Sequence, residues 1–217
     1  ETVEIRLGHL PAAQCGQVSD EYSVIVTGAF SDPIDISGKD TGFATAAAMA
    51  DCAIAGLVMP DRGVVRMNGR TITLVDPQYR ASMGLVQIPG GEAVFRSMTV
   101  EENLEIWSRQ IPEVSRRRER LALVDETFPV LRKRSDALAG SLSGGQQQML
   151  ALAKAVMLEP ELLCIDELSL GLAPVVVQDL LAVVENLKAQ GLTMIIVEQS
   201  VNVALAVADR AVFMERG

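Results

Sequence analysis

Two short segments of this 217-residue sequence carry the residue types best suited to phosphate chemistry. The first is a serine with two glycines, directly before a helical pattern over residues 147–158. Unpaired amides and the helix dipole make such a helix start attractive to an anion, and glycines let a phosphate approach the backbone. An ordinary serine N-cap is the competing interpretation. The segment consists of Leu142, Ser143, Gly144, Gly145 and Gln146.

The second segment is Asp166-Glu167, which follows the apolar run of residues 162–165. At the carboxyl end of a parallel strand, Asp can hold a Mg²⁺ ion through water, and the neighbouring Glu can polarise an attacking water. An acidic turn after a strand is the structural alternative. Because the two segments occur together at a workable spacing, we favour the functional interpretation.

These segments need a scaffold, and the sequence predicts an α/β fold with a mainly parallel sheet covered by helices. Residues 162–165, 194–197 and 211–214 are short apolar runs typical of buried strands. Between the first two runs, Pro174 suits the first position of a helix and Gly191 suits its end. An apolar stripe lies between them, as expected for a helix that covers a sheet. The pattern is that of a βαβ unit.

An antiparallel flap is predicted to join this core. Asn68-Gly69 lies between residues 64–67 and 70–73, and this dipeptide is the strongest short signal for a hairpin.

A charged stretch over residues 99–139 is predicted to be helical. Thr99 and Glu102 are placed to form a capping box at its start. Residues 116–120 hold an arginine run, for which we favour a solvated helix face over a binding patch. We therefore expect a helical subdomain over about residues 91–139.

Bulk properties narrow the function classes. The net charge of −9 gives no basic surface for nucleic acid or anionic lipid. The three cysteines lie far apart without a CxxC pair, which suggests reduced thiols. No apolar stretch approaches the roughly 20 residues needed to cross a bilayer, so we expect membrane attachment through a partner.

At the two chemical segments the sequence resembles the nucleotide-binding domains of ABC-type ATPases. Residues 142–146 match the family's signature sequence, and residues 162–167 match its Walker B strand. Gln199 stands where most relatives have a switch histidine, as it does in the ATP-binding subunits of branched-chain amino-acid importers. The resemblance thus makes Asp166, Glu167 and Gln199 the catalytic candidates. The family's D-loop is matched by Ser169, Leu170, Gly171 and Leu172.

The resemblance implies ATP and Mg²⁺ as cofactors, with Asp166 as the metal residue, and a second nucleotide-binding domain and a membrane permease as partners. In the family, two such domains pair head to tail, and each ATP lies between one domain's Walker A loop and the other's signature helix. Permease docking is implied over about residues 90–106, where Phe95, Met98 and Trp107 are the apolar candidates in and beside that segment. The expected location is the cytoplasmic face of the membrane.

We expect one domain over residues 1–217, with its core over about residues 1–90 and 140–217. The chain begins at Glu1 without a methionine and ends at Gly217, directly after an expected strand. We therefore consider that it is a piece of a longer fused transporter.

The phosphate-binding loop departs from the family. The sequence contains no Gly-x-x-x-x-Gly-Lys motif followed by Ser or Thr, and residues 41–52, where the family would place it, are rich in alanine. Gly38-Lys39 is the only pair that resembles a remnant, and Asp40 follows it where a hydroxyl should bind the metal. Acidic Asp40 and Asp51 would also repel a phosphate. We predict a degenerate Walker A loop.

Two further positions agree with this loss. The family's Q-loop glutamine falls on Gly90, unless a shift lets Gln87 serve. The adenine-stacking aromatic has no counterpart near residues 10–14; Tyr22 is the only nearby aromatic and is compatible with a core position, and His9 suits a structural role.

Three functions remain open. The first, which we favour, is the degenerate half of an asymmetric ATPase pair that lends its signature motif to the partner's ATP site and is catalytic only in that complex. The second is a conventional ATP-hydrolysing subunit with an unconventional loop around Lys39. The third is a regulatory pseudo-ATPase that serves as a docking module. Amino acids are the solutes that the resemblance implies, although the permease decides the cargo.

Overall fold

The computed structural model describes residues 3–8, 22–27, 51–60, 62–91 and 93–214. A five-stranded sheet forms its centre, in the spatial order β5-β6-β7-β2-β8. Strand β2 pairs antiparallel with both of its neighbours, so the other four strands share one direction. The strands are β2 (Tyr22–Thr27), β5 (Leu85–Ile88), β6 (Leu162–Asp166), β7 (Thr193–Glu198) and β8 (Arg210–Met214).

A second, antiparallel sheet comprises β1 (Val3–Gly8), β3 (Arg62–Met67) and β4 (Arg70–Thr71). Asn68 and Gly69 connect β3 to β4 with φ angles of 50° and 71°. Positive φ at both central residues is what a tight hairpin turn requires. The predicted α/β fold with a mainly parallel sheet and an antiparallel flap is confirmed.

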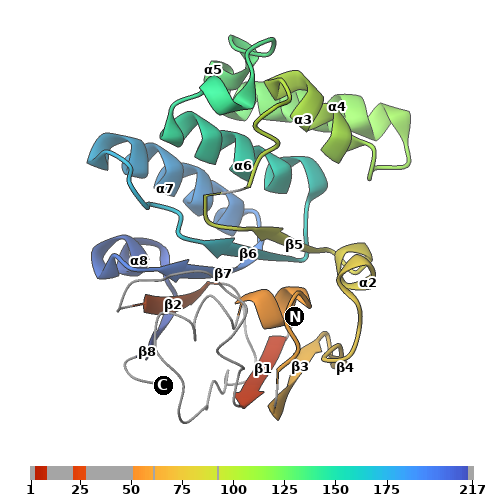
Figure 1. The fold of residues 1–217 in the computed structure, drawn as a ribbon, viewed down its shortest axis with the longest axis vertical. Helices are drawn as coiled ribbons and strands as arrows, with labels where there is room; N and C mark the ends of the chain where they lie inside the picture. The colour runs from red at the N-terminus through yellow and green to blue at the C-terminus, as the bar shows by residue number, and fades with distance from the viewer. Residues whose placement is uncertain (1–2, 9–21, 28–50, 61, 92, 215–217) are drawn as a thin grey trace.

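Helices cover the five-stranded sheet in layers. Helices α6 and α7 lie next to it, and α3, α4 and α5 lie beyond α6 on the side away from the strands (Figure 1). Residues 51–55 form a further helical segment near the antiparallel sheet. The named helices are α2 (Pro77–Ser82), α3 (Val100–Ser108), α4 (Val114–Thr127), α5 (Pro129–Arg132), the 3-10 turn η1 (Ala139–Ser141), α6 (Gly144–Leu158), α7 (Pro174–Ala189) and α8 (Val201–Val207).

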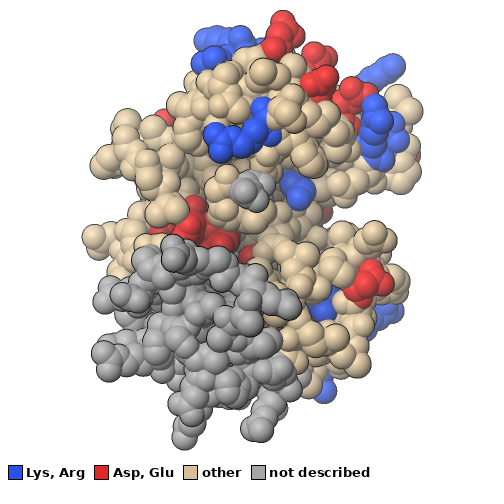
Figure 2. All heavy atoms as spheres, viewed as in Figure 1, with Lys and Arg blue, Asp and Glu red and all other residues tan. Residues whose placement is uncertain are grey.

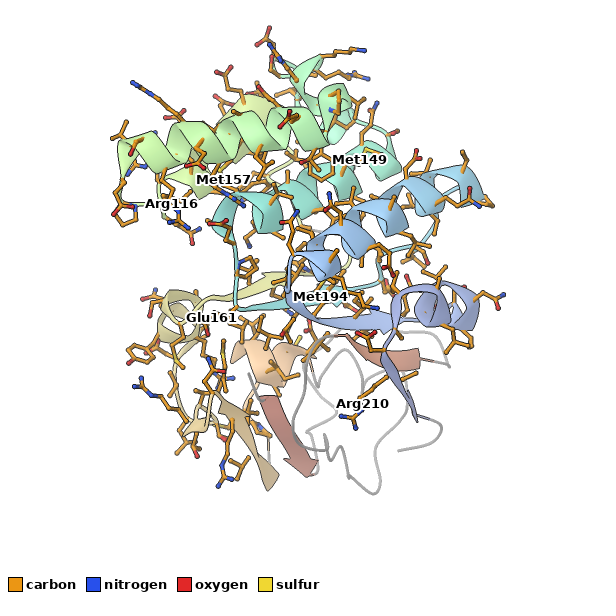
Figure 3. All side chains as sticks on the ribbon, turned by 180° about the vertical axis from the view of Figure 1, so that it is seen from behind. Arg116, Met149, Met157, Glu161, Met194 and Arg210 are labelled. Atoms are coloured by element: carbon orange, nitrogen blue, oxygen red, sulfur yellow. The ribbon has the colours of Figure 1, made fainter. Side chains whose placement is uncertain are left out.

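The core is continuous from the sheet through α6 into the outer helices. Met194 of β7 and Met157 of α6 are both buried within it (Figure 3). Helix α6 is apolar almost all round in its middle, because it lies between the sheet and helices α3 and α4. The helix that presents the serine and glycines at its start is therefore held rigidly along its length.

Three of the four arginines in the run of α4 bind within the molecule. Arg116 and Arg120 donate to the Glu159 carboxylate at the end of α6, at 2.5 and 2.6 Å. Arg120 also donates to the Val156 carbonyl, and Arg117 donates to the Ile111 carbonyl. For these arginines neither a purely solvated face nor a binding patch describes what the structure shows.

Arg80 of α2 terminates the helical segment over residues 51–55. Its guanidinium is buried and donates to the carbonyls of Ala53 and Ile54 at 2.6 and 2.7 Å. Gly56 follows with a φ of 83°, and a Cβ there would lie 2.8 Å from the Arg80 Cζ atom. The arginine thus takes the place of the usual partners of the last helical carbonyls.

Candidate functional site

Helix α6 begins at Gly144, and Ser143 is its N-cap. The Ser143 hydroxyl accepts a hydrogen bond from the Gln146 amide at 3.3 Å, and the Gln146 side chain accepts one from the Ser143 amide at 3.1 Å. Ser143 and Gly144 are exposed, whereas Leu142 and Gly145 are buried. Because the cap uses the hydroxyl oxygen only as an acceptor, the hydroxyl proton remains free to be donated to a ligand.

Asp166 is the last residue of β6, and its carboxylate lies beside Gly90 in the loop that follows β5. Its Oδ1 atom is buried and has no hydrogen-bond partner among the described residues. Burial, together with the charges of Asp51 and Glu167, raises the pKa of Asp166 to about 7, and the Gly90 amide opposes this shift. A buried carboxylate oxygen without a protein donor suits a hard cation such as Mg²⁺. No group of three or more His, Cys, Asp or Glu residues in the described ranges could by itself hold a metal.

The structure brings the catalytic candidates Glu167 and Gln199 together. The Gln199 amide donates to Glu167 Oε1 at 2.7 Å. Glu167 has a φ of 54°, and its backbone amide donates to the Val197 carbonyl at 2.9 Å. The turn after β6 thus points the Glu167 side chain toward the end of β7.

Glu198 is a buried carboxylate beside the site that the sequence reasoning did not single out. It is buried in β7, and its Oε1 atom accepts the Ser169 amide at 2.7 Å. Its Oε2 atom accepts the Ser200 amide at 3.1 Å. A lone carboxylate in an otherwise apolar strand was the available signal. Glu198 fixes the start of the segment over residues 169–172 to the neighbouring strand.

The segment over residues 169–172 turns back toward α6. The Leu172 amide donates to the Ser169 carbonyl at 3.2 Å, and Gly171 has a φ of 69°. Leu170 is exposed over more than half of its surface. This geometry leaves Leu170 available for contact with another surface and turns Leu172 toward the start of α6.

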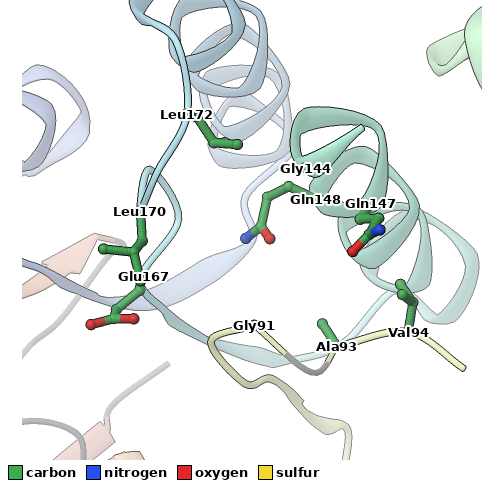
Figure 4. A pocket seen from close by; sticks show the side chains of 9 residues that line it. All are labelled: Gly91, Ala93, Val94, Gly144, Gln147, Gln148, Glu167, Leu170 and Leu172. Atoms are coloured by element: carbon green, nitrogen blue, oxygen red, sulfur yellow. The ribbon is translucent and has the colours of Figure 1, made fainter. Parts of the chain in front are cut away.

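A pocket of about 120 Å³ joins the predicted site segments (Figure 4). Gln148 of α6 contributes to its wall, and the Gln148 Nε2 atom is buried without a partner among the described residues. The pocket is lined by Gly91, Ala93, Val94, Gly144, Gln147, Gln148, Glu167, Leu170 and Leu172. The start of α6, the end of β6 and the loop after β5 therefore meet at one place.

Position 90 lies beside the catalytic candidates but offers no side chain. A Cβ on Gly90 would lie 3.2 Å from Glu167 Oε2 and 3.4 Å from Asp166 Oδ2. Gln87 does not replace it, because the Gln87 amide donates to Asp51 Oδ2 at 2.6 Å. In this structure the Gln87 side chain is thus bound to Asp51 rather than to Asp166 or Glu167.

Asp51 is a buried carboxylate near the end of the window expected for the phosphate loop. Burial raises its pKa to about 6, although hydrogen bonds from Gln87 and Cys164 oppose the shift. Its Oδ1 atom has no partner among the described residues. Gly38, Lys39, Asp40 and most of residues 41–52 lie outside the described residues, as do His9 and the Tyr22 side chain.

Asp51→Asn should stabilise the fold in a pH-dependent way. Because the folded-state pKa, about 6, lies above the ordinary aspartate value of 3.8, ionisation costs the folded state free energy that the unfolded state does not lose. We expect the variant to gain up to about 3 kcal/mol of unfolding free energy above pH 7 and almost nothing near pH 4. Urea unfolding across this range measures it, with exposed Asp136→Asn as the control. A pH-independent gain would contradict the explanation.

The apolar candidates for permease docking differ in exposure. Phe95 is 49% exposed, and Met98 is partly buried. Trp107 is 4% exposed and belongs to the core, so its assignment to the docking surface is wrong. Trp107 lies on the buried face of α3, the helix that packs against α6, and not on the face toward solvent.

Comparison with known proteins decides the family. A family model described as ABC transporter matches residues 52–169, which is more than half of the chain. The chain belongs to the ABC transporter family. The matched residues include the signature segment and the end of β6 in this ABC chain. The match begins after most of the phosphate-loop window.

The relatives include ATP-binding proteins of amino-acid transport. The high-affinity branched-chain amino acid transport ATP-binding protein BraG of Pseudomonas aeruginosa is 38% identical over 71% of this chain and 66% of its own length. The probable branched-chain amino acid transport ATP-binding protein LivF of Archaeoglobus fulgidus is 34% identical over 76% and 70%, respectively. The ABC chain thus spans slightly less than two thirds of BraG.

Solved structures agree on the fold. The ADP conformation of an ATP-binding cassette of an ABC transporter superposes with a TM-score of 0.67 at 24% identity, covering 88% of this chain and 86% of that one. A dimeric post-hydrolysis cassette bound to ADP and Pi gives a TM-score of 0.68 at 15% identity, covering 88% and 98%.

No described helix of the ABC chain is both long and apolar enough to span a membrane.

Proposed function

We propose that this chain is a nucleotide-binding subunit of an ABC transporter and the degenerate half of an asymmetric ATPase pair. One observation carries the proposal: the sequence has no Gly-x-x-x-x-Gly-Lys motif, whereas the signature segment over residues 142–146 is intact. The chain would therefore lend its signature helix to an ATP held by the partner domain.

The charge around the chain's own site supports this division. The pKa of Asp166 is raised by three nearby carboxylates, those of Asp51, Glu167 and Glu198. Figure 2 shows a group of acidic side chains in a hollow at mid-height of the molecule. ATP is itself an anion, so a site with this charge and without a loop lysine binds it poorly.

At the partner's site, the start of α6 would act on developing negative charge. The Ser143 hydroxyl and the amide of exposed Gly144 can donate to phosphate oxygens, and the helix dipole adds to their effect. ATP with Mg²⁺, when bound by the partner, supplies the phosphoryl group that is transferred to water. The chain's own residues orient and stabilise that group without breaking a bond themselves.

The remaining partners and the cargo follow from the family. A permease would anchor the pair at the cytoplasmic face of the membrane, with exposed Phe95 as a candidate contact. The names of BraG and LivF favour amino acids as the solute.

A conventional hydrolysing subunit is the second candidate, and the assembled Glu167–Gln199 pair favours it. In that case the loop around Lys39 would have to hold the phosphates. A pure docking module is disfavoured, because a scaffold has no need of the exposed serine and glycine at the start of α6.

Photoaffinity labelling of the complete transporter separates these candidates. With 8-azido-ATP and Mg²⁺, we expect the label on the partner cassette and not on this chain. The trapped nucleotide should amount to one per pair of cassettes. Labelling of both chains, with two nucleotides per pair, would support the conventional subunit instead.

A further inference from the structure

The two glycines at the start of α6 differ in exposure and in the atoms that surround them. Gly144 is exposed, and a Cβ there would lie 3.2 Å from the flexible end of Leu172. Gly145 is buried, and a Cβ there would lie 2.3 Å from Val176 Cγ1, closer than atoms can approach. Only Gly144 is therefore open to a phosphate from outside. Gly145 is small because α7 packs directly against it.

Val176 is well suited to support α6. It lies in the first turn of α7, which begins at Pro174. Its amide donates to the Ala173 carbonyl at 2.9 Å. A valine is stiff at χ1, so it cannot swing away from an added methyl group as a longer side chain could.

The segment that leads into this turn is itself anchored. Ser169 is held to β7 by Glu198, and Leu168 is fully buried. Leu172 faces the start of α6 across the pocket (Figure 4). A continuous, well-packed stretch of chain therefore connects Glu167 to the signature helix. It comprises the end of β6, the segment over residues 169–172 and the first turn of α7.

We propose that Val176 is a positioning residue for the signature helix. Its contact with Gly145 sets how far the first turn of α6 projects, and hence where Ser143 and the exposed amides stand relative to the partner's ATP. This inference rests on the proposed function. The competing explanation is that Gly145, like Gly144, is small because the partner's nucleotide approaches it.

A double-mutant cycle distinguishes the two explanations. Gly145→Ala should lower ATP turnover of the complete transporter on the order of 10–100-fold, because a misplacement of about 1 Å carries a cost of this size. Val176→Ala alone should have a much smaller effect. In Gly145→Ala/Val176→Ala the space is restored, and most of the turnover should return. A double variant as impaired as Gly145→Ala would overturn the inference in favour of direct contact with nucleotide.

A stability control separates positioning from simple loss of folding. Val184→Ala removes buried methyl groups from the same helix, away from the start of α6. It should lower the melting temperature without lowering kcat. Gly145→Ala should lower kcat more than it changes the KM for ATP. If kcat followed melting temperature across all variants, Val176 would be only structural and the proposal would fail.

Failure of the underlying function would look different. If Ser143→Arg left turnover unchanged, the chain would not lend its signature helix, and the proposed function would fail. The contact itself would still be tested in the chain alone, because Gly145→Ala should lower its melting temperature and Val176→Ala should restore it in the double variant. An alanine within a helix otherwise stabilises it relative to glycine, so loss without recovery would contradict the packing.

Discussion

Ser143→Arg should reduce the ATP turnover of the complete transporter by about 10²–10³-fold, the usual effect of removing a donor to transition-state charge. The structure places Ser143 exposed at the N-cap of α6, with its hydroxyl proton free for a ligand. A bulky arginine would remove that donor and obstruct the first amides of the helix. Under the proposed function, the effect would arise at the ATP held by the partner.

Glu167→Gln should hardly change the same rate. Glu167 lies at the end of β6 and faces the chain's own site, where Gln199 holds it. A general base at a site that holds no nucleotide contributes nothing to turnover. The two changes affect residues of one chain but different ATP sites, so their asymmetry is informative.

Steady-state ATPase rates of the assembled transporter measure both effects. Ser141→Arg is a matched control, because Ser141 is also exposed and lies only two residues earlier, in η1. It should retain most of the activity. A Glu167→Gln loss as large as that of Ser143→Arg would show that this chain hydrolyses ATP itself.

The sequence could predict elements with strong local signals. The apolar runs that became β6 and β7 are continuous because those strands are buried. The Asn68-Gly69 hairpin follows from local backbone preference, since both residues tolerate positive φ. The start of α6 and the placement of Asp166 at the end of β6 are equally local features. The site was predictable to that extent.

The remaining features depend on contacts between distant segments. From the sequence, Arg80 would be expected at the surface. In the structure its guanidinium instead binds the last carbonyls of the helical segment over residues 51–55. The contact between Gly145 and Val176 exists only because α6 and α7 pack side by side. Trp107 was predicted to be a docking residue, but α3 turns it into the core. Periodicity and propensity carry no information on such pairings.

The chain alone should bind Mg-ATP negligibly. Each charge-assisted hydrogen bond from a loop lysine or amide contributes about 1.5–3 kcal/mol, so losing several removes most of the affinity. The described residues around the chain's own site do not make up for these lost hydrogen bonds. Asp51 adds a buried carboxylate there, and Gly90 adds no side chain beside Asp166. The predicted loss of affinity is therefore larger than any single contact could produce.

Titration calorimetry of Mg-ATP into the purified chain tests the central claim most directly, because it asks whether this chain holds a nucleotide without any partner. The family fold must be intact in the sample, which a cooperative melting transition verifies. We expect no saturable heat up to about millimolar ATP, the range in which binding free energy falls to roughly 4 kcal/mol. A dissociation constant in the low micromolar range that is abolished by Lys39→Ala would contradict it.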